Sequence, residues 1–123
     1  MRHVAALATL TLAISACSNT SDPIVCPAIA KPGILVTVLD SATSVATGRS
    51  SRILAHDGAF TDSVPAQWTA ASDGPFPLAY ERTGTYTVTV TKAGYRDWAK
   101  SGIVVNRDRC NVRTVPVTAL LQK

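Results

Sequence analysis

The chain has 123 residues, of which 46% are hydrophobic and 16% are charged, and its formal net charge is +4 at pH 7. A chain of this length can bury one two-layer core, so a multidomain protein is excluded. The basic excess is small and is weak evidence for any polyanionic partner. The sequence contains no evident internal repeat.

The N-terminal segment has the layout of an export signal. Arg2 and His3 supply a polar start, and an apolar run rich in Ala, Leu and Thr follows at 4–14. This run is too short for a membrane-spanning helix, which needs about 20 residues, so we expect a cleaved signal. An exported protein of this kind has no nucleic acid partner.

The residues that end this run resemble a bacterial lipobox. Ile, Ser and Ala at 14–16 stand directly before Cys17. The resemblance implies a signal peptide at 1–16 and acyl chains on Cys17, which would anchor the protein to a membrane stably. In such lipoproteins an Asp after the cysteine favours inner-membrane retention, whereas here the residue is Ser18. The resemblance thus favours the outer membrane, with the domain facing the periplasm.

Residues 17–25 are largely polar and predict a short flexible tether after the lipidated cysteine.

The remaining cysteines predict a disulfide. Cys26 and Cys110 then form an even pair in an oxidising compartment, which favours a bridge between the start of the domain and the segment before its last strand. Free or metal-binding thiols are the alternative, ranked lower because neither cysteine lies in a CxxC or His/Cys pattern.

The first three predicted strands follow from apolar runs and a turn signal. The nearly continuous apolar run at 34–39 predicts a strand that is covered on both faces. The segments 52–55 and 59–64 flank Asp57 and Gly58, a favoured pair for a two-residue hairpin turn. We therefore expect the second and third strands to form a hairpin.

The middle of the chain contains a loop and the clearest strand. Residues 65–77 hold three prolines and Trp68, which predicts a long loop with a small aromatic cluster, followed by a short strand at 77–80. In the segment 85–91, the apolar residues share one face and four threonines share the other. This strict alternation predicts a strand with one buried face.

Two further strands are predicted before the C-terminus. The segment 103–105 predicts a short strand, and 112–121 predicts the last one. Pro116 lies within this last strand and cannot donate a ladder hydrogen bond. We therefore expect the last strand at a sheet edge or with Pro116 at an unpaired position.

The number and spacing of these strands favour a β-sandwich. The sequence GTYTVTV at 84–90, continued by KAGY at 92–95, resembles the signature of carboxypeptidase regulatory-like domains. The segments 108–112 and 115–121 resemble the ends of small bacterial lipoproteins with such a domain. The resemblance implies an all-β, transthyretin-like (prealbumin-like) antiparallel sandwich of seven strands, within a range of six to eight, at 26–123. It implies no activity, because these domains are named for a catalytic neighbour that this chain lacks.

The sequence indicates no catalytic constellation. His56 is the only histidine beyond the signal, and a solvated strand residue beside a turn is far more common than a member of a triad or metal site. Glu81 is the only glutamate, and the aspartates show no calcium-loop spacing. We therefore expect no enzymatic activity, no metal and no cofactor.

Two pairs of residues are candidates for ligand binding. Trp68 and Trp98 could offer exposed rings to a sugar or peptide, with core filling as the alternative, and Trp98 is the one we expect to be exposed. Arg107 and Arg109 could bind acidic cell-wall or lipopolysaccharide groups, with a solvated turn as the alternative.

These observations predict a membrane-anchored envelope lipoprotein whose non-catalytic sandwich binds an envelope protein or a glycan. A structural role, as an accessory subunit of an envelope complex, is the alternative and would leave an exposed apolar patch or an unpaired edge strand. A hydrolase is a third and less favoured class.

Overall fold

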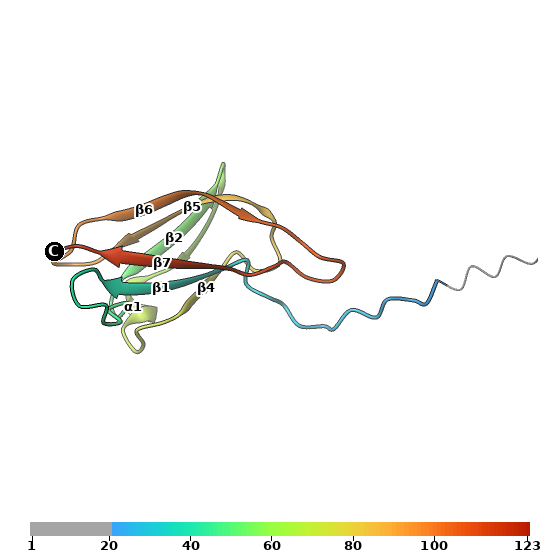
Figure 1. The fold of residues 1–123 in the computed structure, drawn as a ribbon, viewed down its shortest axis with the longest axis horizontal. Helices are drawn as coiled ribbons and strands as arrows, with labels where there is room; N and C mark the ends of the chain where they lie inside the picture. Colours follow the sequence, from blue (N-terminus) through green and yellow to red (C-terminus); the bar gives the residue numbers. More distant parts are fainter. Residues whose placement is uncertain (1–20) are drawn as a thin grey trace, which may run out of the picture.

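The computed structural model describes residues 21–123, which form seven strands and one short helix in two packed sheets (Figure 1). The prediction of an all-β sandwich is confirmed. The predicted signal peptide at 1–16 and the predicted lipid site at Cys17 lie outside the described residues. Within residues 21–123, no helix combines the length and the apolar content needed to cross a membrane.

One sheet has three strands in the order β4-β1-β7. These are β4 (Phe76–Leu78), β1 (Ile34–Asp40) and β7 (Val115–Leu121). β1 pairs antiparallel with β4 but parallel with β7, so the prediction of an antiparallel sandwich is wrong for this pair. Parallel neighbours need a long connection, and here the whole second sheet lies between the two strands in the sequence. The alternation of apolar and polar residues along a strand does not indicate whether it runs parallel or antiparallel to its neighbour, so the sequence pattern could not predict this pairing.

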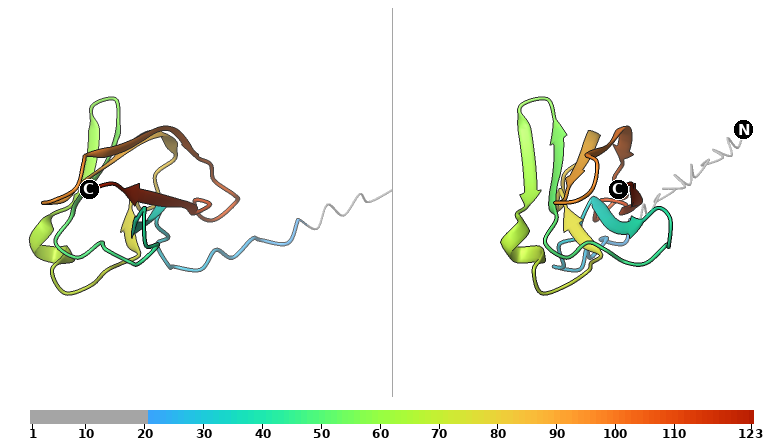
Figure 2. Two further views of the ribbon diagram at one scale, coloured as in Figure 1. Left: turned by 60° about the vertical axis from the view of Figure 1, so that its left-hand side comes forward. Right: turned by 90° about the vertical axis from the view of Figure 1, so that its left-hand side faces the viewer.

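The other sheet has four antiparallel strands in the order β3-β2-β5-β6. These are β3 (Phe60–Val64), β2 (Arg52–Asp57), β5 (Gly84–Thr91) and β6 (Trp98–Val105). β2 and β3 form the predicted hairpin, drawn in green in Figure 2. Its two turn residues are Gly58 and Ala59 rather than Asp57 and Gly58, because Asp57 pairs with Phe60. Of these two turn residues, Gly58 has a positive φ, of 55°, and Ala59 does not. This combination of signs is that of a type II′ turn.

The core lies between the two sheets and follows the predicted alternation. On β5, the side chains of Tyr86, Val88 and Val90 are each 0% exposed, as predicted. Every second residue of β1 is buried as well, but the residues between them are only half-buried, so the prediction of a strand covered on both faces is wrong for its outward face. Fully burying an aliphatic side chain contributes roughly 1.5–3 kcal/mol, so these two central strands supply much of the stability.

A polar cluster closes the core around Tyr86. The Tyr86 hydroxyl donates to the carbonyl of Arg82 (3.1 Å) and accepts from Arg82 Nη1 (3.1 Å). The same nitrogen donates to Asp57 Oδ2 (3.1 Å), and the guanidinium stacks 4.0 Å from the centroid of the Phe60 ring. The hydrogen bonds with Tyr86 and Asp57 raise the pKa of Arg82. A tyrosine hydroxyl bonded to the backbone four residues upstream resembles the tyrosine corner of other sandwiches.

The predicted loop at 65–77 contains a helical turn and no aromatic cluster. α1 (Ala66–Thr69) follows β3, and β4 begins at Phe76, one residue before the short strand predicted at 77–80. Thr69 is fully buried, and its hydroxyl donates to the carbonyl of Ser51 (2.7 Å). Because Thr69 anchors the turn, its neighbour Trp68 points outward and is 72% exposed.

β6 is longer than the predicted strand at 103–105. A β-bulge shifts the register between β5 and β6, since Tyr86 pairs with Ile103 but Val88 pairs with Lys100. Gly102, at a φ of 72°, lies in the bulge and allows the strand to continue through it. The last strand is shorter than predicted, because Val112 forms only an isolated bridge before β7.

Prolines lie on both edges of the three-stranded sheet. Pro77 in β4 and Pro116 in β7 both pair with Leu35 of β1, and β7 is an edge strand as Pro116 predicted. A proline on an edge strand removes a free backbone donor, so both edges are poor templates for pairing with another chain.

The tether is fastened to one end of the sandwich, which we call the tether end. Cys26 and Cys110 form the predicted disulfide. Asn111, next to Cys110, donates from Nδ2 to the carbonyl of Ile29 (2.9 Å) and to Glu81 Oε1 (2.8 Å). Glu81 Oε1 also accepts from the amide of Lys31 (2.7 Å), and these two bonds lower the pKa of Glu81. The segment 26–33 is thus held without belonging to a strand.

Candidate functional site

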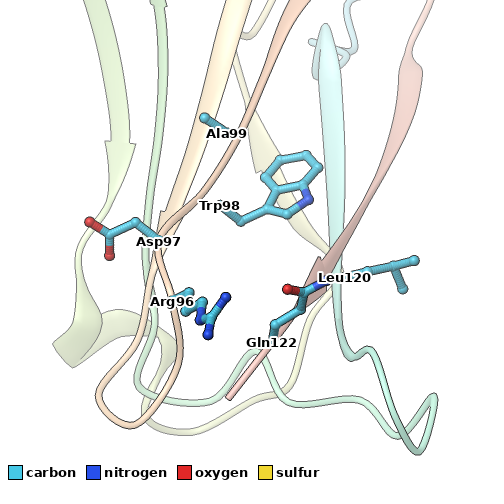
Figure 3. Close-up of a pocket in the computed structure, with 6 residues that line it drawn as sticks. All are labelled: Arg96, Asp97, Trp98, Ala99, Leu120 and Gln122. Carbon is cyan, nitrogen blue, oxygen red and sulfur yellow. The ribbon is translucent and has the colours of Figure 1, made fainter.

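The described part of the chain has a hollow of about 450 Å³ between the start of β6 and the end of β7 (Figure 3). It is lined by the following residues: Arg96, Asp97, Trp98, Ala99, Leu120 and Gln122. The hollow lies at the C-terminal end of β7, whereas the tether enters at the opposite end of the sandwich (Figure 1). We call this second end the far end.

The hollow exists because β6 and β7 are edge strands of different sheets. They lie side by side without a backbone ladder, so one side of the sandwich stays open between them. Trp98 pairs with Val90, whose side chain is buried, and therefore points toward this opening. Trp98 is half-buried and packs against the core, so the expectation that Trp98 is the exposed tryptophan is wrong.

Three side chains with hydrogen-bond donors face the hollow in Figure 3. They are the guanidinium of Arg96, the indole of Trp98 and the carboxamide of Gln122. Asp97 and Leu120 point away from it. The site therefore places an indole ring near two planar polar groups, and Figure 3 shows no carboxylate side chain directed into it.

The turn that carries Arg96 is fixed by contacts on both sides. The Arg96 amide donates to the carbonyl of Gln122 (2.7 Å), which joins the turn to the end of the chain after β7. The hydroxyl of the preceding Tyr95 donates to Asp40 Oδ2 (2.9 Å). This bond, together with the backbone amide of Thr43, lowers the pKa of Asp40. Asp40 thus remains an ionised acceptor that holds the turn in place.

Trp68 and Trp98 do not form a common aromatic platform. Trp68 lies on α1, which follows β3, and Trp98 begins β6. β3 and β6 are the opposite edges of the four-stranded sheet. Three strand spacings of about 4.8 Å separate these edges, so one small ligand cannot contact both rings.

The predicted arginine candidates lie at the tether end. Arg107 forms an ion pair with Glu81, with 2.9 Å between Nη2 and Oε2, and so contributes to the tether attachment. Arg109 is exposed beside the disulfide. The structure therefore separates both arginines from the Trp98 hollow.

The catalytic candidates are not assembled into a site. His56 is exposed on β2, with Thr61 and Thr87 as its neighbours on the adjacent strands. In the part of the chain that the structure describes, no three His, Cys, Asp or Glu residues lie close enough together to hold a metal ion.

Arg96 and Gln122 were missed by the sequence analysis. Arg96 lies two residues before Trp98, and this closeness in the sequence could have indicated that it belongs to the same site. Gln122, in contrast, is 24 residues beyond Trp98. Only the packing of β6 beside β7 brings Gln122 to the site.

Comparison of the chain with protein-family models, curated proteins and solved structures gives no match. Residues 21–123 thus form a small all-β sandwich with a polar and aromatic hollow at its far end. The resemblance to carboxypeptidase regulatory-like domains stays a prediction.

Proposed function

We propose that the protein is an envelope lipoprotein whose β-sandwich is a non-catalytic, glycan-binding module. The observation that carries this proposal is the Trp98 hollow with Arg96 and Gln122 beside the indole. A ring face packs against the apolar face of a sugar, and planar polar side chains bond to its hydroxyl groups. The volume of the hollow lies within the usual range for small-ligand sites.

The position of the hollow supports a ligand beyond the anchoring membrane. The tether enters at one end of the sandwich and the hollow lies at the other (Figure 1). Cys26 lies nine positions after Cys17, a span of about 30 Å when the chain is fully extended. On a lipid anchor of this length, the domain would stay near its membrane while the far end could turn outward.

The first test of the proposal concerns glycan binding. Trp98→Ala is expected to reduce co-sedimentation of the full-length protein with purified peptidoglycan at least about tenfold, because it removes the apolar area that the ring would bury against a sugar together with a stacking contribution of about 0.5–1.5 kcal/mol. Trp68→Ala is the matched control, since it removes an exposed ring at a different site. Equal binding of peptidoglycan by the wild type and the Trp98 variant would show that the hollow is not the glycan-binding site.

The second test concerns the anchor. Replacing Cys17 with serine is expected to prevent acylation, so that fractionation of the producing cells finds the protein outside the membrane fraction. Mass spectrometry of the wild type should show acyl chains on Cys17. A Cys17→Ser protein that stays in the membrane fraction would contradict lipid anchoring.

An accessory role in an envelope complex is a second candidate function, and one surface favours it. The outward face of the β4-β1-β7 sheet carries apolar side chains, among them the paired residues Leu39 and Leu120. Leu120 is 49% exposed, and Leu35 lies on the same face between Pro77 and Pro116. Crosslinking in the native envelope distinguishes the two functions, because an assembly subunit would crosslink to a protein through this face.

A further inference from the structure

We propose that the Trp98 hollow selects an acidic sugar, one whose ring carries a carboxylate, and that Arg96 binds this carboxylate. This inference rests on the proposed glycan-binding function and names its ligand class. It is carried by the charges around the hollow.

The Arg96 guanidinium is available for a ligand. Within residues 21–123, three other arginines are in ion pairs, namely Arg49 with Asp73, Arg82 with Asp57 and Arg107 with Glu81. The Arg96 side chain has neither an ion pair nor a hydrogen bond to any of these described residues, and it faces the hollow (Figure 3). A free guanidinium beside an aromatic ring is suited to bind a carboxylate through two parallel hydrogen bonds.

The two aspartates at the turn that carries Arg96 do not compete for its guanidinium. Asp97 is the next residue, but its carboxylate points to the other side of the strand (Figure 3). Asp40 accepts bonds from the Tyr95 hydroxyl (2.9 Å) and from the amides of Ala42 (2.9 Å) and Thr43 (3.0 Å). The Asp97 carboxylate is therefore directed away from the ligand position, and the Asp40 carboxylate is already occupied by these three hydrogen bonds.

A second cation lies along the same edge. Lys100 pairs with Val88, whose side chain is buried, so Lys100 belongs to the same face of β6 as Trp98. It is exposed at the open side of the sandwich. Two residues along a strand span about 6.6 Å, so a ligand that extends from Trp98 along β6 would meet a second positive charge.

The proposal is tested by calorimetric titration of the detergent-extracted full-length protein with trigalacturonate and with its methyl ester. The ester keeps the sugar rings and removes the negative charges. We expect the acid to bind at least about tenfold more tightly than the ester, because charge-assisted hydrogen bonds exceed neutral ones by such a factor. Arg96→Gln should remove most of this preference, because it weakens binding of the acid more than binding of the ester.

The control variant is Arg109→Gln, which makes the same charge change at the tether end. It should keep the preference for the acid, and Trp98→Ala should lose binding of both ligands. Equal affinity of the wild type for acid and ester would overturn the acidic ligand class while leaving glycan binding intact. A preference that is as large in Arg96→Gln as in the wild type, or that is lost in Arg109→Gln, would overturn the assignment to Arg96. Binding of neither ligand would overturn this inference, while the peptidoglycan assay decides the proposed function separately.

Discussion

Replacing Cys110 with serine is expected to lower the free energy of unfolding by about 3 kcal/mol. Its bond to Cys26 spans 84 residues, and a loop of that length gives about 4.5 kcal/mol in the chain-entropy model. The expected loss of stability is smaller than this value because the segment 26–33 is not part of a strand. Without the disulfide, this segment would gain conformational freedom in the folded state of the variant. Urea unfolding of the oxidised wild type and the variant measures the difference.

The paired variants provide the control for this result. Cys26→Ser, Cys110→Ser and the double variant should lose the same amount, because each removes the same covalent bond. A double variant that unfolds at the urea concentration of the wild type would show that the bond does not stabilise the domain. The hydrogen bonds from Asn111 to Ile29 and Glu81 should keep part of the tether attached in all three variants.

Replacing Tyr86 with alanine is expected to cost about 4 kcal/mol of stability. The ring is fully buried and packs edge-on against Phe60, with 6.3 Å between the ring centroids. Tyr86→Phe keeps the ring and removes the hydroxyl, which leaves Arg82 without one donor and one acceptor partner. This second variant should lose about 1–2 kcal/mol.

Urea unfolding of both variants separates the ring from its hydroxyl. Tyr80→Ala is the matched control, because Tyr80 is 51% exposed and its loss should change stability by less than about 0.5 kcal/mol. A Tyr86→Phe variant as unstable as Tyr86→Ala would mean that the hydroxyl network, and not packing of the ring, dominates at this position.

The strands with strict alternation were predictable from the sequence because their pattern is local. The segment 85–91 alternates between valine or tyrosine and threonine, and its apolar side chains are all buried. Pro116 indicated an edge strand because the missing donor is a property of the residue itself. The disulfide was also predictable, because the two cysteines after Cys17 have only each other as partners within the chain.

The features that were missed depend on contacts between distant segments. The direction of β7 relative to β1 is set by the path of the intervening chain. The full length of β6 was hidden because the bulge at Gly102 breaks the alternation that marks a strand. The exposure of Trp68 follows from the anchoring of Thr69 on Ser51, and the site at Trp98 needs Gln122 from another strand.

The parallel pairing of β1 with β7 also has a kinetic meaning. β1 lies near the start of the domain and β7 at its end, yet the two strands are in register over seven residues, from Ile34 opposite Val115 to Asp40 opposite Leu121. Contacts between such distant segments slow folding, because a long loop must close before they form. The β4-β1-β7 sheet therefore cannot be completed until β7 has been synthesised and has reached β1. Until then, the edge of β1 that pairs with β7 has no partner strand.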